Sequence, residues 1–205
     1  MRARGADLGP SVEQAIALYA AGYFPMDDPA EEHNPLPFYA AERRAVLELD
    51  DAARAAVRRR VRRSLRAARE DWRLVRNQRF DEVLDGCARP REPGDGVWIT
   101  PRMRTLYHRL HEAGLAHSFE IDAGGELAAG MIGVLIGRAA MLESMFHRVG
   151  HAGNVLLART LDQLAAEGFA LCDIQLPTEH TTWIGARLVE RAEYEARLRA
   201  ALGLA

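Results

Sequence analysis

The sequence predicts a mixed α/β fold (α+β), with a small N-terminal lobe in front of a larger domain. Two observations lead to this prediction. Apolar runs of strand length alternate with segments of helical periodicity, and no internal repeat or low-complexity linker interrupts them. The loop REPGDG at 91–96 separates two stretches of regular pattern. We therefore expect the lobe to cover residues 1–92 and the larger domain to cover residues 93–205.

Composition and length limit the class of protein. The chain has 205 residues, of which 48% are hydrophobic and 27% are charged, and its formal net charge is -2. These values are typical of a globular protein and exclude the disordered and membrane classes. The N-terminus has no apolar segment of signal-peptide length, and the longest apolar run is interrupted at Gly137 and Arg138 before it could cross a bilayer. We expect a cytoplasmic protein without a membrane segment.

In the N-terminal half, a helix is predicted to begin after Ser11 and to end before Gly22. A proline-rich loop with several aromatic residues follows over 23–43. Two short strands and a helix make up the remainder of this half, at 45–49, 72–77 and 80–88.

Between those two strands lies an arginine-rich segment, residues 54–69, which holds eight arginines and no acidic residue. Its apolar residues recur at helical spacing and leave the arginines on the opposite face: Val57, Val61, Leu65 and Ala68. The sequence contains no lysine, and the planar guanidinium suits phosphate. A basic face of this density favours nucleic-acid binding, and a solvated helix without a ligand is the alternative. The residues named for phosphate contact are Arg58, Arg62 and Arg66.

The C-terminal half has a sharper pattern. A helix is predicted to begin at Thr100, with Pro101 in its first turn, and to end before Gly114. The elements after it are three strands, a helix, a strand and a terminal helix, at 116–122, 126–136, 139–146, 154–167, 170–175 and 190–202. A short loop is expected between the last strand and the terminal helix. This order is that of an acetyltransferase-like (GNAT) core.

In a GNAT core the third strand leads through a loop into a helix whose N-terminus can hold a phosphate. RVGHAG at 148–153 occupies this place. A coenzyme A loop resembles Q/R-x-x-G-x-G/A, and counting from Arg148 its glycine falls on His151. This mismatch weakens the interpretation as an acyl-CoA N-acyltransferase.

Several blocks in the chain, in the same order, resemble the leucyl/phenylalanyl-tRNA-protein transferase family. They are YFPM at 23–26, GVWITPRM at 96–103, YHRLHEAGLAHSFE at 107–120, ESMFHR at 143–148, and CDIQ at 172–175 followed by EHTTWIGA. The resemblance implies an enzyme that moves leucine or phenylalanine from its tRNA to the N-terminal arginine or lysine of a protein, which marks that protein for N-end rule degradation. It also implies a small N-terminal lobe and an acetyltransferase-like core.

The chemistry of this reaction limits what the chain must supply. An aminoacyl ester is already activated, so positioning can suffice without ATP, a metal ion or another cofactor. The seven histidines form no HExxH motif, and Cys87 and Cys172 lie far apart without CxxC spacing. We expect no metal site and no cofactor. The expected partners are aminoacyl-tRNA and proteins with N-terminal arginine or lysine.

Three residues are candidates for the chemical step. Within ALCDIQ, the strand period of two places Asp173 and Gln175 on one face, and the resemblance implies that this pair lies at the peptidyl-transfer centre. Because an amide is a very poor base, we expect Gln175 to orient the amine or the ester carbonyl. Asp173 would fix the amide or hold the cationic acceptor side chain. Glu143, at the end of a buried strand, needs a partner such as Arg148 or a substrate ammonium.

An apolar pocket is expected for the donor side chain, formed by Met26, Phe38, Tyr39, Met145 and Phe146. Core packing is the alternative for the last two. Further substrate contacts are expected from Trp98, Ser144 and His180.

The chain departs from the family pattern at several of these places. Phe38 and Tyr39 replace paired tryptophans, Met26 replaces an aromatic residue, HAGN at 151–154 replaces N-A-S-K, and Trp183 replaces a serine. The ranking of leucine, phenylalanine and methionine as donors is therefore open, and a tRNA-binding relative with altered donor specificity or without transfer activity is a further alternative. We expect a monomer, because no exposed apolar helix stripe is left over.

Overall fold

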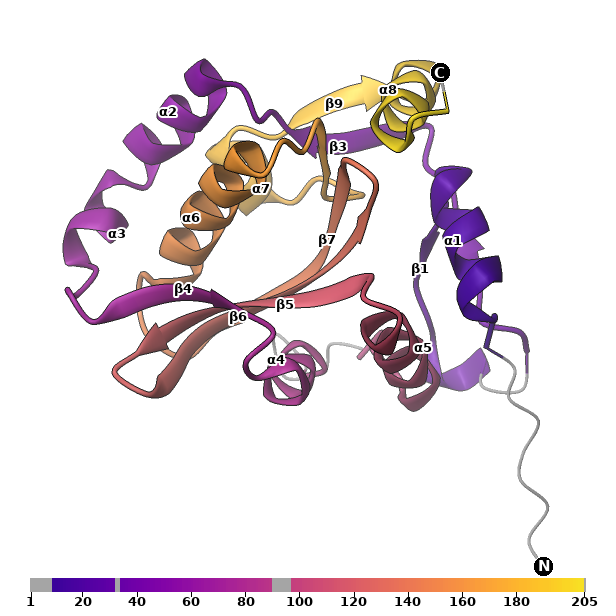
Figure 1. Ribbon diagram of the computed structural model, residues 1–205, viewed down its shortest axis with the longest axis horizontal. Coiled ribbons are helices and arrows are strands. Elements are labelled where there is room, and N and C mark those ends of the chain that lie inside the picture. The colour runs from indigo at the N-terminus through magenta and orange to yellow at the C-terminus, as the bar shows by residue number, and fades with distance from the viewer. Residues whose placement is uncertain (1–8, 32–33, 90–96, 205) are drawn as a thin grey trace, which may run out of the picture.

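A seven-stranded sheet organises the described part of the chain, residues 9–31, 34–89 and 97–204, in a computed structural model (Figure 1). In sheet order the strands are β4 (Trp72–Arg76), β5 (Ala116–Ala123), β6 (Glu126–Ile136), β7 (Ala139–His147), β8 (Leu171–Asp173), β3 (Arg43–Leu47) and β9 (Arg187–Glu190). Neighbouring strands are antiparallel, except that β7 and β8 are parallel. The predicted mixed α/β class is confirmed.

Helices cover both faces of this sheet (Figure 1). One face carries α1 (Val12–Ala20), α4 (Phe80–Cys87), α5 (Pro101–Glu112) and α8 (Arg191–Leu202). The other carries α2 (Asp51–Arg60), α3 (Arg62–Ala67), α6 (Ala152–Ala166) and the short α7 (Glu179–Ile184). Because side chains alternate along a strand, Met141 of β7 joins the first core while Ala140 and Leu142 join the second.

A small hairpin precedes the sheet. It pairs β1 (Phe24–Pro25) with β2 (Phe38–Tyr39), and a short 3-10 helix, η1 (Pro29–Glu31), lies between them. The helix before it begins as predicted, because Ser11 and Gln14 form a reciprocal cap at the start of α1. Gly22 follows its end with φ +84°, a left-handed conformation that glycine adopts without strain.

The N-terminal half also contributes to the large sheet, since β3 and β4 are two of its strands. The predicted boundary between residues 92 and 93 falls within 90–96, outside the described residues. The division into a lobe and a larger domain stays a prediction.

Four predicted elements differ from the structure, and one of them is the proline-rich loop over 23–43, which contains β1, η1 and β2. The arginine-rich segment forms two helices, α2 and α3, separated at Val61, instead of one helix over 54–69. Arginines four residues apart repel one another there, and a β-branched valine is a poor helix former. The strand predicted over 170–175 ends at Asp173, and the expected short loop after it contains α7 and β9. With six residues and little apolar character, α7 has too short a pattern to be detected.

Within the described ranges, no helix has both the length and the apolar character needed to cross a membrane.

Candidate active site

The site begins where two parallel strands separate. β7 and β8 pair only from Ala139 and Leu171 to Met141 and Asp173. Beyond this point β7 continues to His147, while the chain after Asp173 bonds to β3 through Ala45. The gap between the parted strands opens into a cavity of about 970 Å³.

The cavity wall has two parts. One is apolar and belongs to the core between the sheet and α6, with Leu47, Met131, Leu142, Met145, Leu157 and Ile174. The other lies toward the opposite face and mixes apolar and polar groups, with Cys87, Trp98, Glu143, Phe146 and Arg148. Because the gap between β7 and β8 is open to both faces of the sheet, the cavity has an apolar part on one side and a part with polar groups on the other.

Most of the predicted site residues lie around this cavity. Its lining includes Met26, Trp98, Glu143, Ser144, Met145, Phe146, Gln175 and His180. Phe38 and Tyr39 lie outside the lining. Phe38 packs edge-on against Tyr19, with ring centroids 6.0 Å apart, and Tyr39 is a surface residue of the hairpin.

Asp173 is completely enclosed by the protein, with 0% of its surface exposed. Arg44 donates to it at two points, from Nε to Oδ1 at 3.0 Å and from Nη2 to Oδ2 at 2.7 Å. The Tyr194 hydroxyl donates to Oδ2 at 2.8 Å, and the backbone N–H of Gln175 donates to Oδ1 at 2.8 Å. The carboxylate therefore has its hydrogen bonds inside the protein and presents no surface to a substrate.

Arg44 is itself a buried anchor, with 1% of its surface exposed. Its guanidinium lies between the rings of Phe24 and Tyr194, at 4.5 and 4.7 Å from their centroids, and donates to the Gly22 carbonyl at 2.9 Å. One side chain thus ties the hairpin and α8 to the end of β8. Sequence reasoning missed Arg44 and Tyr194; the one available signal was an arginine beside the apolar run of a short strand.

Gln175 lies in a tight turn and not on a strand face. Its φ is +57°, in the left-handed region, so the expected strand alternation between Asp173 and Gln175 is wrong. The two residues are brought together instead by the bond from the Gln175 backbone to the Asp173 carboxylate. With the amide oriented to match its neighbours, its nitrogen donates to the Leu142 and Ile174 carbonyls at 3.0 and 3.1 Å. The amide oxygen is then the atom that can accept a bond from a substrate N–H.

Glu143 has a partner that the sequence did not indicate. The Tyr19 hydroxyl, from α1, donates to its Oε1 at 2.9 Å, and the expected partner Arg148 pairs elsewhere. Burial raises the pKa of Glu143 to about 8; the Tyr19 bond opposes this shift and the nearby Asp173 charge adds to it. Glu143 is therefore a carboxyl group that gains and loses its proton near neutral pH.

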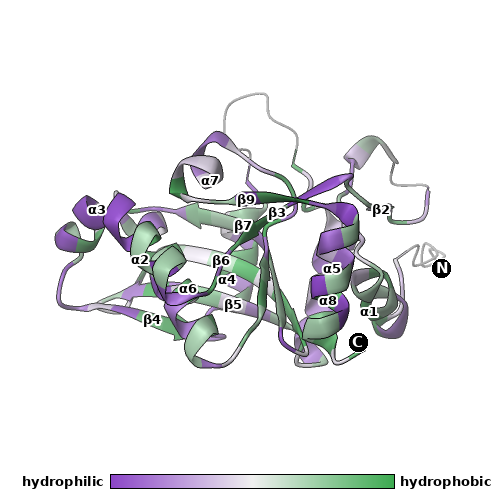
Figure 2. Ribbon diagram, turned by 90° about the horizontal axis from the view of Figure 1, so that it is seen from above, coloured by the Kyte–Doolittle hydropathy of each residue, from purple (hydrophilic) through white to green (hydrophobic). Residues whose placement is uncertain are grey.

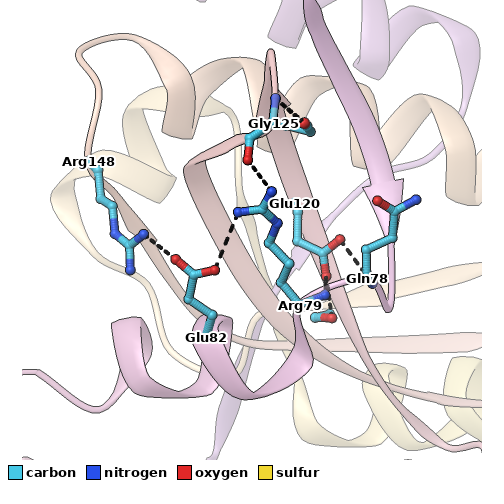
Figure 3. A network of polar contacts seen from close by, with 8 residues as sticks. Gln78, Arg79, Glu82, Glu120, Gly125 and Arg148 are labelled. Atoms are coloured by element: carbon cyan, nitrogen blue, oxygen red, sulfur yellow. Dashed lines mark hydrogen bonds and ion pairs between the residues drawn. The ribbon is translucent and has the colours of Figure 1, made fainter.

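Arg148 is held at the cavity wall by α4 (Figure 3). Its guanidinium forms an ion pair with Glu82, which forms a second ion pair with Arg79. The start of α4 is fixed in turn by the buried Glu120, which accepts from the backbone N–H groups of Gln78 and Arg79 (Figure 3).

Phe146 is seated on two glycines behind this wall. A Cβ atom at Gly86 would lie 2.3 Å from its ring, and one at Gly130 would lie 2.7 Å from it. The Arg148 guanidinium is 5.5 Å from the centroid of the same ring. The absence of a side chain at these two glycines therefore allows the Phe146 ring to occupy its position in the cavity wall.

The arginine-rich helices lie near one end of the molecule, where α3 is strongly hydrophilic (Figure 2). Val57, Val61, Leu65 and Ala68 join the second core, which confirms the predicted apolar stripe. Arg62 and Arg66 are exposed, whereas Arg58 is half-buried and pairs with Asp162 of α6. The three arginines named from the sequence are therefore not equivalent.

The loop before α6 has a left-handed residue at the position where the coenzyme A motif has glycine. This residue is His151, with φ +72°. Its Nδ1 lies 3.1 Å from the Ser64 hydroxyl of α3. Within the described residues, no group of three or more histidine, cysteine, aspartate or glutamate side chains is arranged to hold a metal ion.

Several known proteins are similar to this chain over most of its length. A family model described as leucyl/phenylalanyl-tRNA protein transferase matches residues 46–199. Proteins of that name are 39% identical in Stutzerimonas stutzeri (96% of this chain, 82% of the relative), 41% in Anaeromyxobacter dehalogenans strain 2CP-C (97% and 81%) and 39% in Deinococcus radiodurans (95% and 90%).

Among solved structures, FemX has a similar fold, with a TM-score of 0.54 at 12% identity over 88% of this chain and 68% of that chain. The fold is accordingly an α+β one that is similar to the fold of FemX. The ordered sequence blocks, the match over residues 46–199 and the near full-length relatives lead to one conclusion: the chain belongs to the leucyl/phenylalanyl-tRNA-protein transferase family.

Proposed function

We propose that this aminoacyltransferase moves leucine or phenylalanine from aminoacyl-tRNA to the N-terminal arginine or lysine of a protein, and so marks that protein for N-end rule degradation. The observation that carries the proposal is the turn at the parted strands, where Asp173 holds Gln175 at the wall of the cavity. Family membership supports the class of substrates, and the cavity is the site that we assign to both of them.

The donor side chain is assigned to the apolar part of the cavity. Met131, Met145 and Ile174 offer a surface that matches leucine or phenylalanine and gives no partner to a charged group. An apolar pocket separates side chains that differ by one methylene by only about 1 to 3 kcal/mol. Discrimination among leucine, methionine and phenylalanine should therefore be graded.

The acceptor is assigned to the other part of the cavity, where Glu143 lies. An acceptor arrives with an α-ammonium group, whose ordinary pKa of roughly 7.7 to 8.0 is close to the pKa of about 8 of Glu143. Matched pKa values favour proton transfer between the two groups. Glu143 therefore contacts the acceptor, and its deprotonated form, whose share grows as the pH approaches 8, takes the first proton.

The chemical step then depends mainly on how the amine is oriented toward the ester carbonyl, and it needs no further acidic or basic side chain. The freed amine attacks the ester carbonyl carbon, a C–N bond forms and the C–O bond to the ribose breaks. The second proton of the amine passes to the ribose oxygen, which leaves as the 3′-hydroxyl of the tRNA. The Gln175 amide oxygen accepts an N–H bond from the amine and aligns it for attack. Asp173 does not contact the substrates; it is a positioning residue, because its carboxylate fixes the turn that carries Gln175.

The tRNA body is assigned to the arginine-rich helices. Arg62 and Arg66 are exposed and available to phosphates, while Arg58 contributes less because it already pairs with Asp162. We also propose that the protein is cytoplasmic. We propose that it is a monomer, because the apolar faces of the described helices are buried in the two cores.

The experiment that tests this function is direct. The protein is incubated with tRNA charged with leucine, phenylalanine or methionine and with a peptide that begins with arginine, and the products are weighed by mass spectrometry. We expect addition of leucine or phenylalanine to this peptide and none to the same peptide after N-terminal acetylation. Absence of any aminoacyl addition would contradict the proposal.

A further inference from the structure

The short helix α7 presents an aromatic pair at the edge of the cavity. Trp183 is 51% exposed, and its ring is stacked with that of His180 at a centroid distance of 6.0 Å and an interplanar angle of 30°. His180, together with Thr178 and Thr181, lines the cavity. Single exposed apolar residues are common on protein surfaces, so the meaning of Trp183 depends on its surroundings.

The first half of α7 is connected to the arginine-rich helices through a polar chain. His180 donates from Nε2 to the Asn154 side-chain oxygen at 2.9 Å, and Asn154 donates from its side-chain nitrogen to the Ser64 hydroxyl of α3 at 3.2 Å. Ser64 is 4% exposed. These bonds fix the His180 ring, and with it the face against which Trp183 stacks.

The second half of α7 is next to an arginine. Arg60, the last residue of α2, donates from Nη1 to the Ile184 carbonyl at 3.5 Å, and a Cβ at Gly185 would lie 3.0 Å from the same nitrogen. The exposed arginines that follow along this surface are Arg62, Arg63 and Arg66. The helix α7 therefore lies between a cationic surface and the cavity that contains Gln175.

This placement has a consequence for a bound tRNA. Its aminoacyl ester must reach Gln175 in the cavity, and its phosphates favour the arginines outside. The unpaired nucleotides at the 3′ end of the tRNA must then cross the region between them. Proteins that hold single strands combine a cationic surface with aromatic rings on which the bases stack.

We propose that Trp183, backed by His180, is a stacking platform for an unpaired base at the 3′ end of the tRNA. The inference rests on the proposed function, because it takes tRNA as the donor. Serine, which the family pattern has at this position, cannot stack on a base. The platform is thus a feature of this chain that adds to the binding supplied by the arginines.

The test compares two RNAs: an uncharged tRNA, and the same tRNA without its unpaired 3′ nucleotides. Affinities are measured at one fixed salt concentration for the wild type, Trp183→Ala and Trp183→Phe. We expect Trp183→Ala to bind the intact tRNA about 5- to 100-fold more weakly, since stacking contributes energies of this order. The truncated tRNA should bind all three proteins equally, and Trp183→Phe should stay close to the wild type.

A matched control is Leu188→Ala on β9, which removes a side chain that is 42% exposed without an aromatic ring. It should leave both affinities unchanged. If Trp183→Ala weakens both RNAs equally, or neither, the platform is wrong. Leucine transfer by the wild type is measured in the same samples, so that failure of the platform can be told from failure of the proposed function. If the wild type transfers leucine but Trp183→Ala keeps the wild-type ratio of affinities for intact and truncated tRNA, only the platform is contradicted.

Discussion

Arg44 and Asp173 form a buried ion pair directly behind the turn that carries Gln175. The Arg44 Nη2 and Asp173 Oδ2 atoms are 2.7 Å apart, and the side chains are 2% and 0% exposed. The same carboxylate holds the Gln175 backbone N–H at 2.8 Å. Arg44 therefore acts on the site through Asp173, as a positioning residue.

Arg44→Ala should lower transfer on the order of 100-fold, the cost of a small misplacement of reacting groups. The change leaves a space between the Phe24 and Tyr194 rings and a buried carboxylate without its cation, which typically costs about 3 to 5 kcal/mol of stability. Millimolar guanidinium, at concentrations that do not denature, should enter this space and restore part of the transfer rate.

The matched control for this rescue is Arg191→Ala, which removes an exposed arginine that pairs with Glu195. That variant should transfer at nearly the wild-type rate and should not respond to guanidinium. A variant Arg44→Ala that stays folded but gains nothing from guanidinium would argue against the positioning role. Tyr194→Phe offers a milder test, since it removes one hydrogen bond to Asp173 and keeps the ring.

Glu143→Gln should change how stability depends on pH. The folded protein keeps the Glu143 proton up to a pKa of about 8, whereas the unfolded chain loses it near 4.5. Between these values the unfolded state binds fewer protons, so the free energy of unfolding of the wild type falls by up to about 1.4 kcal/mol per pH unit. This contribution is present below the lower value and is lost as the pH rises through the higher one.

The variant lacks this titration, so its free energy of unfolding relative to that of the wild type should rise from about pH 5 to pH 8 and then stay constant. Urea unfolding at several pH values measures the difference. A gap that is constant over this range would mean that the pKa of Glu143 is not raised. Around pH 8, where a large share of the wild-type Glu143 has lost its proton, the same variant should transfer more slowly, because glutamine cannot take a proton from the acceptor.

Much of the fold could be predicted because its signals are local. The cap at Ser11, the turn at Gly124–Gly125 and the alternation of strands and helices in the C-terminal half each depend on neighbouring residues. The contacts that build the site are different in kind. Arg44 and Asp173 are 129 residues apart, and Tyr19 and Glu143 are 124 apart. No periodicity joins such pairs: the pairing of β3 with β8 brings Arg44 to Asp173, and the packing of α1 brings Tyr19 to Glu143.

The outcome for the pocket follows the same logic. Met145 and Phe146 are adjacent in a strand, and both line the cavity because the gap opens to both faces of the sheet. Phe38 and Tyr39, in contrast, belong to a hairpin whose position is decided by packing against α1 and by the Arg44 anchor. Motif spacing alone could not predict that they lie outside the lining.

Arg62→Ala with Arg66→Ala should weaken tRNA binding and flatten its dependence on salt. Removal of one arginine–phosphate interaction should reduce the slope of log affinity against log salt by about 0.9 or less. Arg58→Ala is the matched control within the same segment; because Asp162 already pairs with Arg58, its effect on the slope should be smaller. An unchanged slope in the double variant would mean that these helices form a solvated surface that does not bind tRNA. The preference among donor amino acids should be unaffected in either case.

Gly86→Ala should displace Phe146 and lower transfer by about 10-fold or more. The added Cβ would lie 2.3 Å from the far end of the ring, so the ring has to swing away from α4. A second change, Phe146→Leu, should remove this clash and recover most of the loss. Gly150→Ala, which meets no atom within 4 Å, is the control. If the double variant is as slow as Gly86→Ala, the loss does not act through Phe146.

The most direct test of the account is the single-turnover transfer rate of the wild type and Gln175→Ala with saturating phenylalanyl-tRNA and an arginine-initiated peptide. A positioning amide predicts a loss of more than about 100-fold in Gln175→Ala, with tRNA affinity within about 2-fold of the wild type. Gln175→Glu, which keeps an oxygen at this place, should lose about 10- to 100-fold. Transfer by Gln175→Ala at the wild-type rate would contradict the account, since the peptide bond would then form without the Gln175 amide that is proposed to align the amine.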